Sequence, residues 1–187
     1  LCENENVKKV DYSKVLLFWS DERAVSKEDE SSNYKMAMDA GFRSLVPEDH
    51  IFPMDGLGNL ELNANAYEAT IKFALPSGQF DLVMLGMGDD GHTASLFPNT
   101  EALHIKNKLV AANQVPQKNT SRLTFTFLCI NLAKEIVIYV LGEEKAAIVK
   151  EVFHSPFDLN QLPVQAIGTK EHKALWILDD KSASQLF

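Results

Sequence analysis

The segment from residue 80 to residue 92 places the tightest limit on the fold of this chain. It starts with the mostly apolar run FDLVML at residues 80–85 and passes directly into the glycine-rich polar stretch GMGDDGH at residues 86–92. A short apolar run bounded by turn residues is typical of a strand buried in a sheet. Gly86 and Gly88 would leave backbone N–H groups accessible at the end of that strand, where they could cradle an anion or an oxyanion.

Apolar runs and helical spacing alternate along the rest of the chain. Further strands are predicted at residues 14–19, 51–54, 109–115, 123–130, 135–141 and 173–178. Helices are predicted at residues 31–45, 63–75 and 143–154, with a helical turn at 93–97 and a short helix after the last strand. Ser31 or Ser32 can cap the first helix. The alternation predicts an α/β protein with an open, mostly parallel sheet and helices on both faces, in a single domain over residues 1–187.

The composition argues against several classes of function. Acidic residues outnumber basic ones by 26 to 18 and give a formal charge of -8, which disfavours a nucleic-acid-binding surface. A few placed cations can still bind one small anion. The two cysteines, Cys2 and Cys129, do not suggest a disulfide framework, so we expect a reducing compartment, the cytoplasm. No apolar stretch is long enough to span a membrane. We expect the protein to be a monomer or a weak homo-oligomer and its partner to be a small molecule.

Polar residues cluster where the predicted strands end. Ligands of open α/β sheets bind beyond the carboxyl ends of the strands. Asp21 and Arg23 follow the first predicted strand, and Lys145 follows the strand predicted at residues 135–141. Arg122 precedes its strand instead, so whether it joins the site depends on the fold.

Asp90 and His92 are the pair best suited to acid–base chemistry. They lie two positions apart across a glycine, and a carboxylate near a histidine can orient the ring and raise its basicity. The simpler interpretation is a hydrogen-bonded loop with a solvated histidine. Asp21 also has two open interpretations, a contact to substrate or a structural ion pair with Arg23. A lysine such as Lys145 is unfavourable at the start of a helix unless it meets an anion, which favours a binding role.

These residues lie in motifs that resemble a known family. The run GMGDDGHTASLFP, from Gly86 to Pro98, resembles the signature of the 6-phosphogluconolactonase family. Supporting resemblances are FWSDER at residues 18–23 with SNY at 32–34, RLTFT at 122–126, GEEKA at 142–146 and WILD at 176–179. Together they cover nearly the whole chain in the family's order.

The resemblance implies an open α/β sheet related to that of the glucosamine-6-phosphate deaminases. It implies hydrolysis of 6-phosphogluconolactone to 6-phosphogluconate, the second step of the oxidative pentose phosphate pathway, without a metal or an organic cofactor. In that reaction His92 would activate water for attack on the lactone carbonyl, and Asp90 would orient or support it. The residues that would bind substrate are Asp21, Arg23, Asn33, Gly86, Gly88, Arg122 and Lys145, with Lys145 and Arg122 preferred for the phosphate.

The chain departs from the family pattern at its start. The family's N-terminal segment, with a Gly-Gly-Ser/Thr-Pro loop that helps to hold the phosphate, has no counterpart here, so the chain is expected to be truncated. Two alternatives therefore stay open: an inactive chain that binds sugar phosphates, and a deaminase-type isomerase. The deaminase motif carries an acidic residue after its histidine, and TASLFP at residues 93–98 lacks one. We expect lactone hydrolysis from the full-length form.

Overall fold

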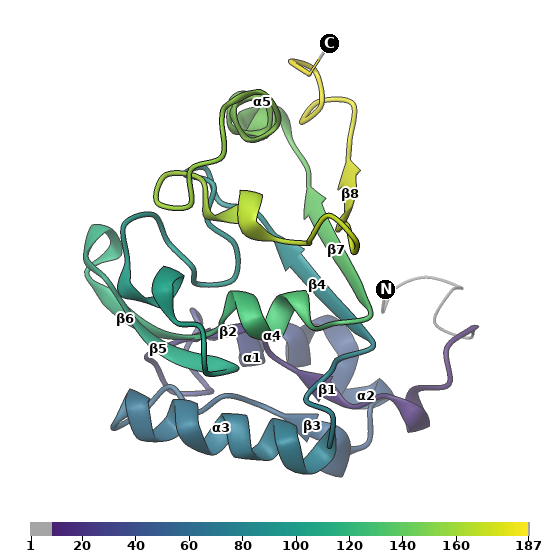
Figure 1. The fold of residues 1–187 in the computed structure, drawn as a ribbon. Coiled ribbons are helices and arrows are strands. Elements are labelled where there is room, and N and C mark those ends of the chain that lie inside the picture. Colours follow the sequence, from purple (N-terminus) through teal and green to yellow (C-terminus); the bar gives the residue numbers. More distant parts are fainter. Residues whose placement is uncertain (1–8, 187) are drawn as a thin grey trace.

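Figure 1 shows the fold in a computed structural model that describes residues 9–186. Its helices are α1 (Asn33–Ala37), α2 (Arg43–Leu45), α3 (Leu60–Ala74), α4 (Phe127–Asn131) and α5 (Ala146–His154). Its strands are β1 (Leu17–Phe18), β2 (Asp21–Arg23), β3 (Ile51–Phe52), β4 (Leu82–Gly86), β5 (Val110–Val115), β6 (Thr120–Phe125), β7 (Glu135–Val140) and β8 (Leu175–Leu178). The strands form a parallel pair β1-β3, an antiparallel sheet β2-β6-β5 and a parallel sheet β4-β7-β8.

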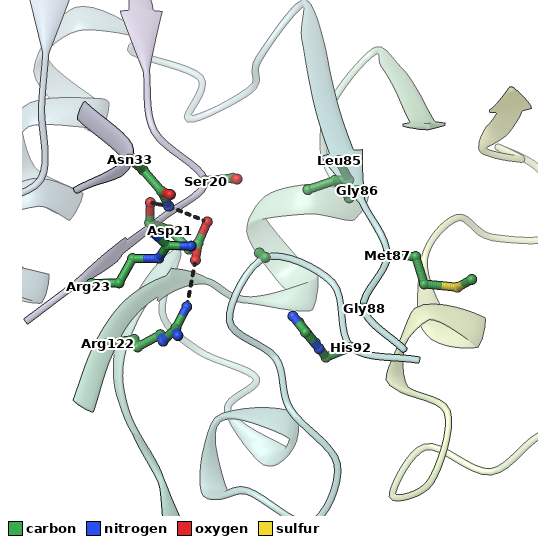
Figure 2. Close-up of a pocket in the computed structure, with 11 residues that line it drawn as sticks. Ser20, Asp21, Arg23, Asn33, Leu85, Gly86, Met87, Gly88, His92 and Arg122 are labelled. Carbon is green, nitrogen blue, oxygen red and sulfur yellow. Dashed lines mark hydrogen bonds and ion pairs between the residues drawn. The ribbon is translucent and has the colours of Figure 1, made fainter. Parts of the chain in front are cut away.

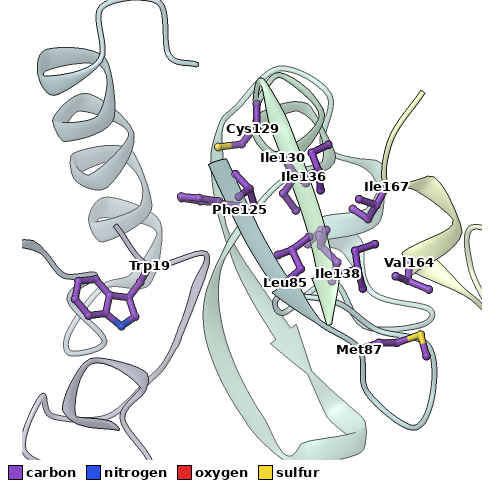
Figure 3. Close-up of a cluster of buried hydrophobic side chains, with 14 of the residues drawn as sticks. Trp19, Leu85, Met87, Phe125, Cys129, Ile130, Ile136, Ile138, Val164 and Ile167 are labelled. Atoms are coloured by element: carbon purple, nitrogen blue, oxygen red, sulfur yellow. The ribbon is translucent and has the colours of Figure 1, made fainter. Parts of the chain in front are cut away.

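The parallel sheet β4-β7-β8 carries the glycine-rich loop at the end of β4. Side chains alternate along each strand, so that Leu85 and Ile138 are buried on one face. They belong to the same core as Ile130 of α4 and Val164 (Figure 3). The opposite face is apolar and exposed at Leu82, Met84, Tyr139, Leu175 and Ile177. The core therefore holds the end of β4, and with it the loop, in a fixed position.

The second sheet, β2-β6-β5, is antiparallel. The predicted α/β class is confirmed. The apolar pattern predicted strands where β5 and β6 lie, but it did not predict β2, because β2 consists of the charged residues Asp21, Glu22 and Arg23. An antiparallel sheet can keep one face polar, so hydrophobic periodicity is weak there. The register places Arg23 directly opposite Arg122 and Asp21 opposite Thr124. Charged side chains from two distant segments thus share one sheet.

The helix predicted at residues 31–45 is interrupted. Ser32 is its N-cap, as expected, and accepts a hydrogen bond from the backbone N–H of Lys35. After α1 the chain forms a π-helical segment, Met38–Phe42, and then the single turn α2. Gly41 has φ +112°, a conformation outside the helical region that glycine adopts readily. This residue breaks the continuous helix that the apolar spacing predicted.

In the middle of the chain, one predicted element is too long at its end and another is wrong. The strand expected at residues 123–130 ends at Phe125, because Thr126 caps α4 by accepting a hydrogen bond from the N–H of Cys129. The helical turn expected at residues 93–97 is an irregular turn closed by a bridge between Thr93 and Leu96. Ala94 in that turn has φ +48°, which no right-handed helical turn can contain.

The strand expected at residues 14–19 is shorter than predicted. A 3-10 turn occupies Tyr12–Lys14, and strand pairing begins only at Leu17. The hydroxyl of Tyr67 on α3 accepts from the N–H of Trp19 and donates to the carbonyl of Phe52, so this side chain bridges the ends of β1 and β3. The segment after β8 is a turn and not the expected helix. Among the described residues, no helix has the length and apolar character needed to cross a bilayer.

Candidate active site

A cleft of about 270 Å³ lies where the end of β4 faces the sheet β2-β6-β5 (Figure 2). All of the site residues predicted from the sequence, except Asp90 and Lys145, line it: Asp21, Arg23, Asn33, Gly86, Gly88, His92 and Arg122. Ser20, Leu85, Met87 and Ala94 complete the lining. The structure thus brings residues from separate stretches of the sequence to one cleft.

His92 is held from behind by Asp90, which lies just outside the lining. Nδ1 of His92 is 2.5 Å from Oδ1 of Asp90, and the same oxygen accepts from the backbone N–H of His92 at 3.2 Å. Burial raises the pKa of Asp90, but the hydrogen bonds and charge of His92 outweigh it, and the net pKa is lowered. Since an ionised carboxylate can only accept, Nδ1 carries the proton, and in the neutral form of the ring Nε2 presents its lone pair. The pair has the arrangement of a general base and its orienting group.

The two glycines of the loop differ in what they provide. A Cβ on Gly88 would lie 2.0 Å from Cε1 of His92, so only glycine leaves room for the imidazole. The Gly88 N–H already donates to the carbonyl of His92, which occupies one donor of the expected cradle. Gly86 accepts a hydrogen bond from the hydroxyl of Thr93, and a Cβ there would meet no atom within 4 Å. Gly86 therefore keeps the floor of the cleft open.

Asp21 is a mostly buried carboxylate on the opposite wall, with 15% of its side chain exposed. Its Oδ2 accepts from the hydroxyl of Ser95 at 2.6 Å, and its Oδ1 accepts from the side-chain amide of Asn33 at 3.1 Å. Nη1 of Arg122 is 3.9 Å from Oδ2 of Asp21. Burial raises the pKa of Asp21, although the hydrogen bond from Ser95 and the charges of Arg23 and Arg122 act in the opposite direction. The ion-pair interpretation named Arg23, whereas the arginine within ion-pair distance of Asp21 is Arg122. Asp21 also lines the cleft, so a contact to substrate stays a prediction.

Two arginines face each other across neighbouring strands. Arg23 and Arg122 are direct partners in the β2–β6 register, where like charges destabilise an antiparallel pair. Burial lowers the pKa of Arg122, and the charge of Arg23 lowers it further. The Nε atoms of both arginines are buried and have no hydrogen-bond partner within the described residues. Two guanidinium groups therefore lie side by side at the cleft, and paired guanidinium groups are suited to binding an anion.

Lys145 is placed near the cleft rather than in its lining. Its ammonium group forms an ion pair with Asp89, in the loop that follows β4. Asp89 is 81% exposed while Lys145 is 20% exposed, so solvent and ions reach this pair from the aspartate side. The role of Lys145 as a phosphate ligand stays a prediction, and Asp89 would compete with the phosphate for the ammonium group.

Sequence reasoning assigned no role to Ser95 and Glu22. Ser95 lies inside the signature run, and its fully buried hydroxyl joins that loop to Asp21. The carboxylate of Glu22 is buried and accepts from the N–H groups of Asn33 and Tyr34 and from the hydroxyl of Ser32. It therefore holds the start of α1, from which Asn33 reaches Asp21. No local sequence pattern signals either contact, because each partner lies ten or more positions away.

The described residues contain no group of three His, Cys, Asp or Glu side chains disposed to hold a metal ion. The expectation of a metal-independent site stays a prediction, which chelation can test.

Comparisons with known proteins agree with the resemblance in the motifs. The chain is 42% identical over 172 residues to the 6-phosphogluconolactonase of Chlamydia trachomatis, covering 92% of this chain and 66% of that protein. It is 36% identical over 182 residues to the 6-phosphogluconolactonase of Synechocystis, covering 94% of this chain and 75% of that protein. The chain thus spans about two thirds of the length of the chlamydial relative.

Solved structures give the same picture. The crystal structure of devB protein superposes with a TM-score of 0.90 at 28% identity, over all of this chain and 80% of that one. The 6-phosphogluconolactonase of Thermotoga maritima superposes with a TM-score of 0.79 at 28% identity, over 95% of this chain and 77% of that one. A monomeric glucosamine-6-phosphate deaminase, at 20% identity and a TM-score of 0.79, shares the fold. The model of the family of glucosamine-6-phosphate isomerases and 6-phosphogluconolactonase matches residues 1–176, and the chain belongs to this family.

Proposed function

We propose that the protein containing this chain hydrolyses 6-phospho-D-glucono-1,5-lactone to 6-phospho-D-gluconate, in the oxidative pentose phosphate pathway. The observation that carries the proposal is the His92–Asp90 pair at a cleft whose other wall holds two arginines. Membership of the family and the activity named for the relatives support it. Because the chain spans only part of the length of those relatives, the proposal concerns the whole protein.

The chemistry begins at His92. Asp90 holds the Nδ1–H, so that Nε2 can take a proton from a water molecule as its oxygen attacks the lactone carbonyl. Attack forms one C–O bond and places negative charge on the carbonyl oxygen. When the tetrahedral intermediate collapses, the bond from carbon to the ring oxygen breaks, and the proton held by His92 passes to that oxygen. The products are the carboxylic acid and the freed hydroxyl group, and His92 returns to its starting state.

The arginine wall supplies substrate binding. A phosphate dianion placed against Arg23 and Arg122 would relieve the repulsion between the two cations. Asp21 limits the net charge of this wall and is itself fixed by Ser95 and Asn33. Binding energy from the phosphate then holds the lactone carbonyl near His92, which lowers the entropic part of the barrier.

The test is a rate of lactone opening above the spontaneous rate, measured on the protein as its gene encodes it, with 6-phosphogluconate detected as the product. His92→Ala should lose the excess rate, while His104→Ala, which changes an exposed histidine away from the cleft lining, should keep it. Ammonia released from glucosamine 6-phosphate would instead indicate the deaminase alternative. Phosphate binding without any excess rate would indicate the binding-only alternative.

A further inference from the structure

Phe97 contacts both His92, the proposed general base, and Arg122, a proposed phosphate ligand. Its ring stacks on the imidazole of His92, with centroids 3.9 Å apart and planes inclined by 20°. The guanidinium carbon of Arg122 lies 5.4 Å from the centroid of the same ring. The Phe97 side chain is 1% exposed, so these contacts are made inside the protein.

The backbone around Phe97 is tied to the sheet rather than left as a free loop. The hydroxyl of Thr100 donates to the Phe97 carbonyl at 2.7 Å. The side-chain amide of Asn113, on β5, donates to that hydroxyl at 3.0 Å and to the carbonyl of Ser95 at 2.8 Å. The chain is therefore held on both sides of the ring, and the position of the ring is set by β5.

The hydrogen bond that Nδ1 of His92 donates to Asp90 does not by itself fix the plane of the His92 ring. A single bond to Nδ1 fixes one atom and leaves the imidazole able to turn about that contact. The stacked Phe97 ring removes this freedom, and the backbone of Gly88 limits the ring as well, since even a Cβ at Gly88 would overlap it. The direction of Nε2 is thus determined by packing.

We propose that Phe97 is a positioning residue that holds the imidazole of His92 and the guanidinium of Arg122 at a fixed spacing, so that base and anion site act on one substrate molecule. The proposal rests on the proposed function for its kinetic consequences. An aromatic face attracts a guanidinium group and stacks well on an imidazole, and an aliphatic side chain of similar volume offers neither interaction.

The variants Phe97→Leu and Phe97→Tyr separate this role from simple packing. If the ring positions both groups, Phe97→Leu should lower kcat roughly 10- to 100-fold, the order expected when a reacting group is slightly misplaced. The same variant should raise KM roughly 3- to 10-fold, as expected for a lost cation–π contact. Phe97→Tyr keeps the ring and should stay within about threefold of wild type in kcat.

Packing alone predicts the reverse order, because leucine suits a buried apolar site and tyrosine brings a hydroxyl group into it. Phe125→Leu is the matched control, since Phe125 is a buried ring on β6 that contacts Phe80 and Tyr67. It should lower thermal stability without changing the kcat and KM of the folded fraction. Equal kinetic losses in the leucine and tyrosine variants, or no loss in Phe97→Leu, would overturn the proposal.

If Phe97→Tyr does not fold, pentafluorophenylalanine at position 97 keeps the ring shape and reverses its charge distribution. We expect unchanged thermal stability with a raised KM, and an unchanged KM would overturn the contact to Arg122. The affinity for inorganic phosphate needs no turnover and reports on the arginine side of the cleft. A weaker affinity in Phe97→Leu but not in Phe97→Tyr would support the positioning role even if the protein opened no lactone, while equal affinities of the wild type and Phe97→Leu would overturn the contact to Arg122.

Discussion

The hydroxyl of Ser95 donates a 2.6 Å hydrogen bond to the carboxylate of Asp21, although 74 positions separate the two residues in the sequence. This bond joins the turn that follows the glycine-rich loop to β2, and so connects the two walls of the cleft. Burial raises the pKa of Asp21 in spite of this bond and of the nearby arginines. The protein therefore holds a carboxylate where its ionised form is disfavoured.

Asp21→Asn should change how stability depends on pH. A raised pKa means that the folded state holds the Asp21 proton more tightly than the unfolded chain, in which an aspartate has a pKa of about 3.9. The contribution of Asp21 to the free energy of unfolding is therefore fully present at a pH below its pKa in the unfolded chain. It is lost as the pH rises through its pKa in the folded protein. The variant should therefore be at least as stable as wild type at neutral pH and lose that advantage in acid.

Urea unfolding midpoints measured across this pH range check the sign. Asp81→Asn, which removes an exposed carboxylate paired with Lys134, is the control for a simple change of charge. A variant at Asp21 that is less stable than wild type at pH 7 but equal to it in acid would contradict the prediction.

His92→Ala and Asp90→Asn should both act mainly on kcat. General base catalysis typically contributes ~10²–10⁴-fold, so His92→Ala should lose activity of that order. Asp90 has a lowered pKa and is ionised at neutral pH, so Asp90→Asn removes a charge and lets the imidazole adopt the wrong tautomer. In steady-state assays against pH, kcat/KM of the wild type should fall on the acid side, and this fall should be absent from His92→Ala. A His92→Ala variant with near wild-type kcat would show that another group is the base.

Lys145 and Asp89 should shift KM in opposite directions. If Lys145 meets the phosphate, Lys145→Ala should raise KM, with some loss of kcat because remote binding energy also positions the carbonyl. Asp89→Asn frees the ammonium group from its ion pair and should lower KM about two- to fivefold, the size expected for an exposed pair. Lys150→Ala, an exposed lysine on α5, is the control. Unchanged KM in both variants would exclude Lys145 from the site.

Alanine substitutions at Gly86 and Gly88 should have different effects, because Gly88 leaves room for the His92 ring and Gly86 leaves room for the substrate in the cleft. A Cβ at Gly88 overlaps the imidazole of His92, so Gly88→Ala should displace the ring and lower kcat about 10²-fold. A Cβ at Gly86 meets no atom within 4 Å, so Gly86→Ala should fold normally and raise KM as the methyl group enters the cleft. Thermal melts and kinetics of the two variants test this, and a Gly88→Ala variant with wild-type kcat would be inconsistent with the ring position.

Activity should survive removal of divalent ions. The chemistry proposed for His92 and Asp90 needs no metal, and two such side chains make at most two ligands. Dialysis against a chelator, followed by metal analysis and assay, should leave kcat unchanged. Activity that disappears and returns with an added divalent ion would refute this expectation.

The sequence predicted the parts of the molecule that local patterns encode. The strand at residues 80–85 and the helix at residues 63–75 correspond to β4 and α3, because burial and periodicity act over a few neighbouring residues. The break at Gly41 and the cap at Thr126 were not predicted. In each case a single residue ends an element, by a glycine backbone conformation at Gly41 and by a capping hydroxyl at Thr126, although the apolar pattern continues beyond it.

The site was predicted as a set of residues but not as an arrangement. The family motifs indicated Asp21, His92 and Arg122, which the fold brings to one cleft. Nothing in the sequence indicated that Arg23 and Arg122 would be partners across two strands, since β2 has no apolar pattern to reveal it. Lys145 was expected beside the phosphate, whereas the structure pairs it with Asp89, a contact set by the folding of two separate loops.

The pairing of Arg23 with Arg122 also bears on how the protein folds. Strand β2 must dock on β6 against the repulsion of two cations, and the residues concerned are nearly a hundred positions apart. An anion bound between them would remove that repulsion as the strands meet. Refolding from denaturant should therefore be faster in phosphate than in chloride of equal ionic strength. Arg23→Gln should refold at the faster rate in either salt. Equal refolding rates of the wild type in both salts would show that β2 and β6 pair only after the rate-limiting step of folding.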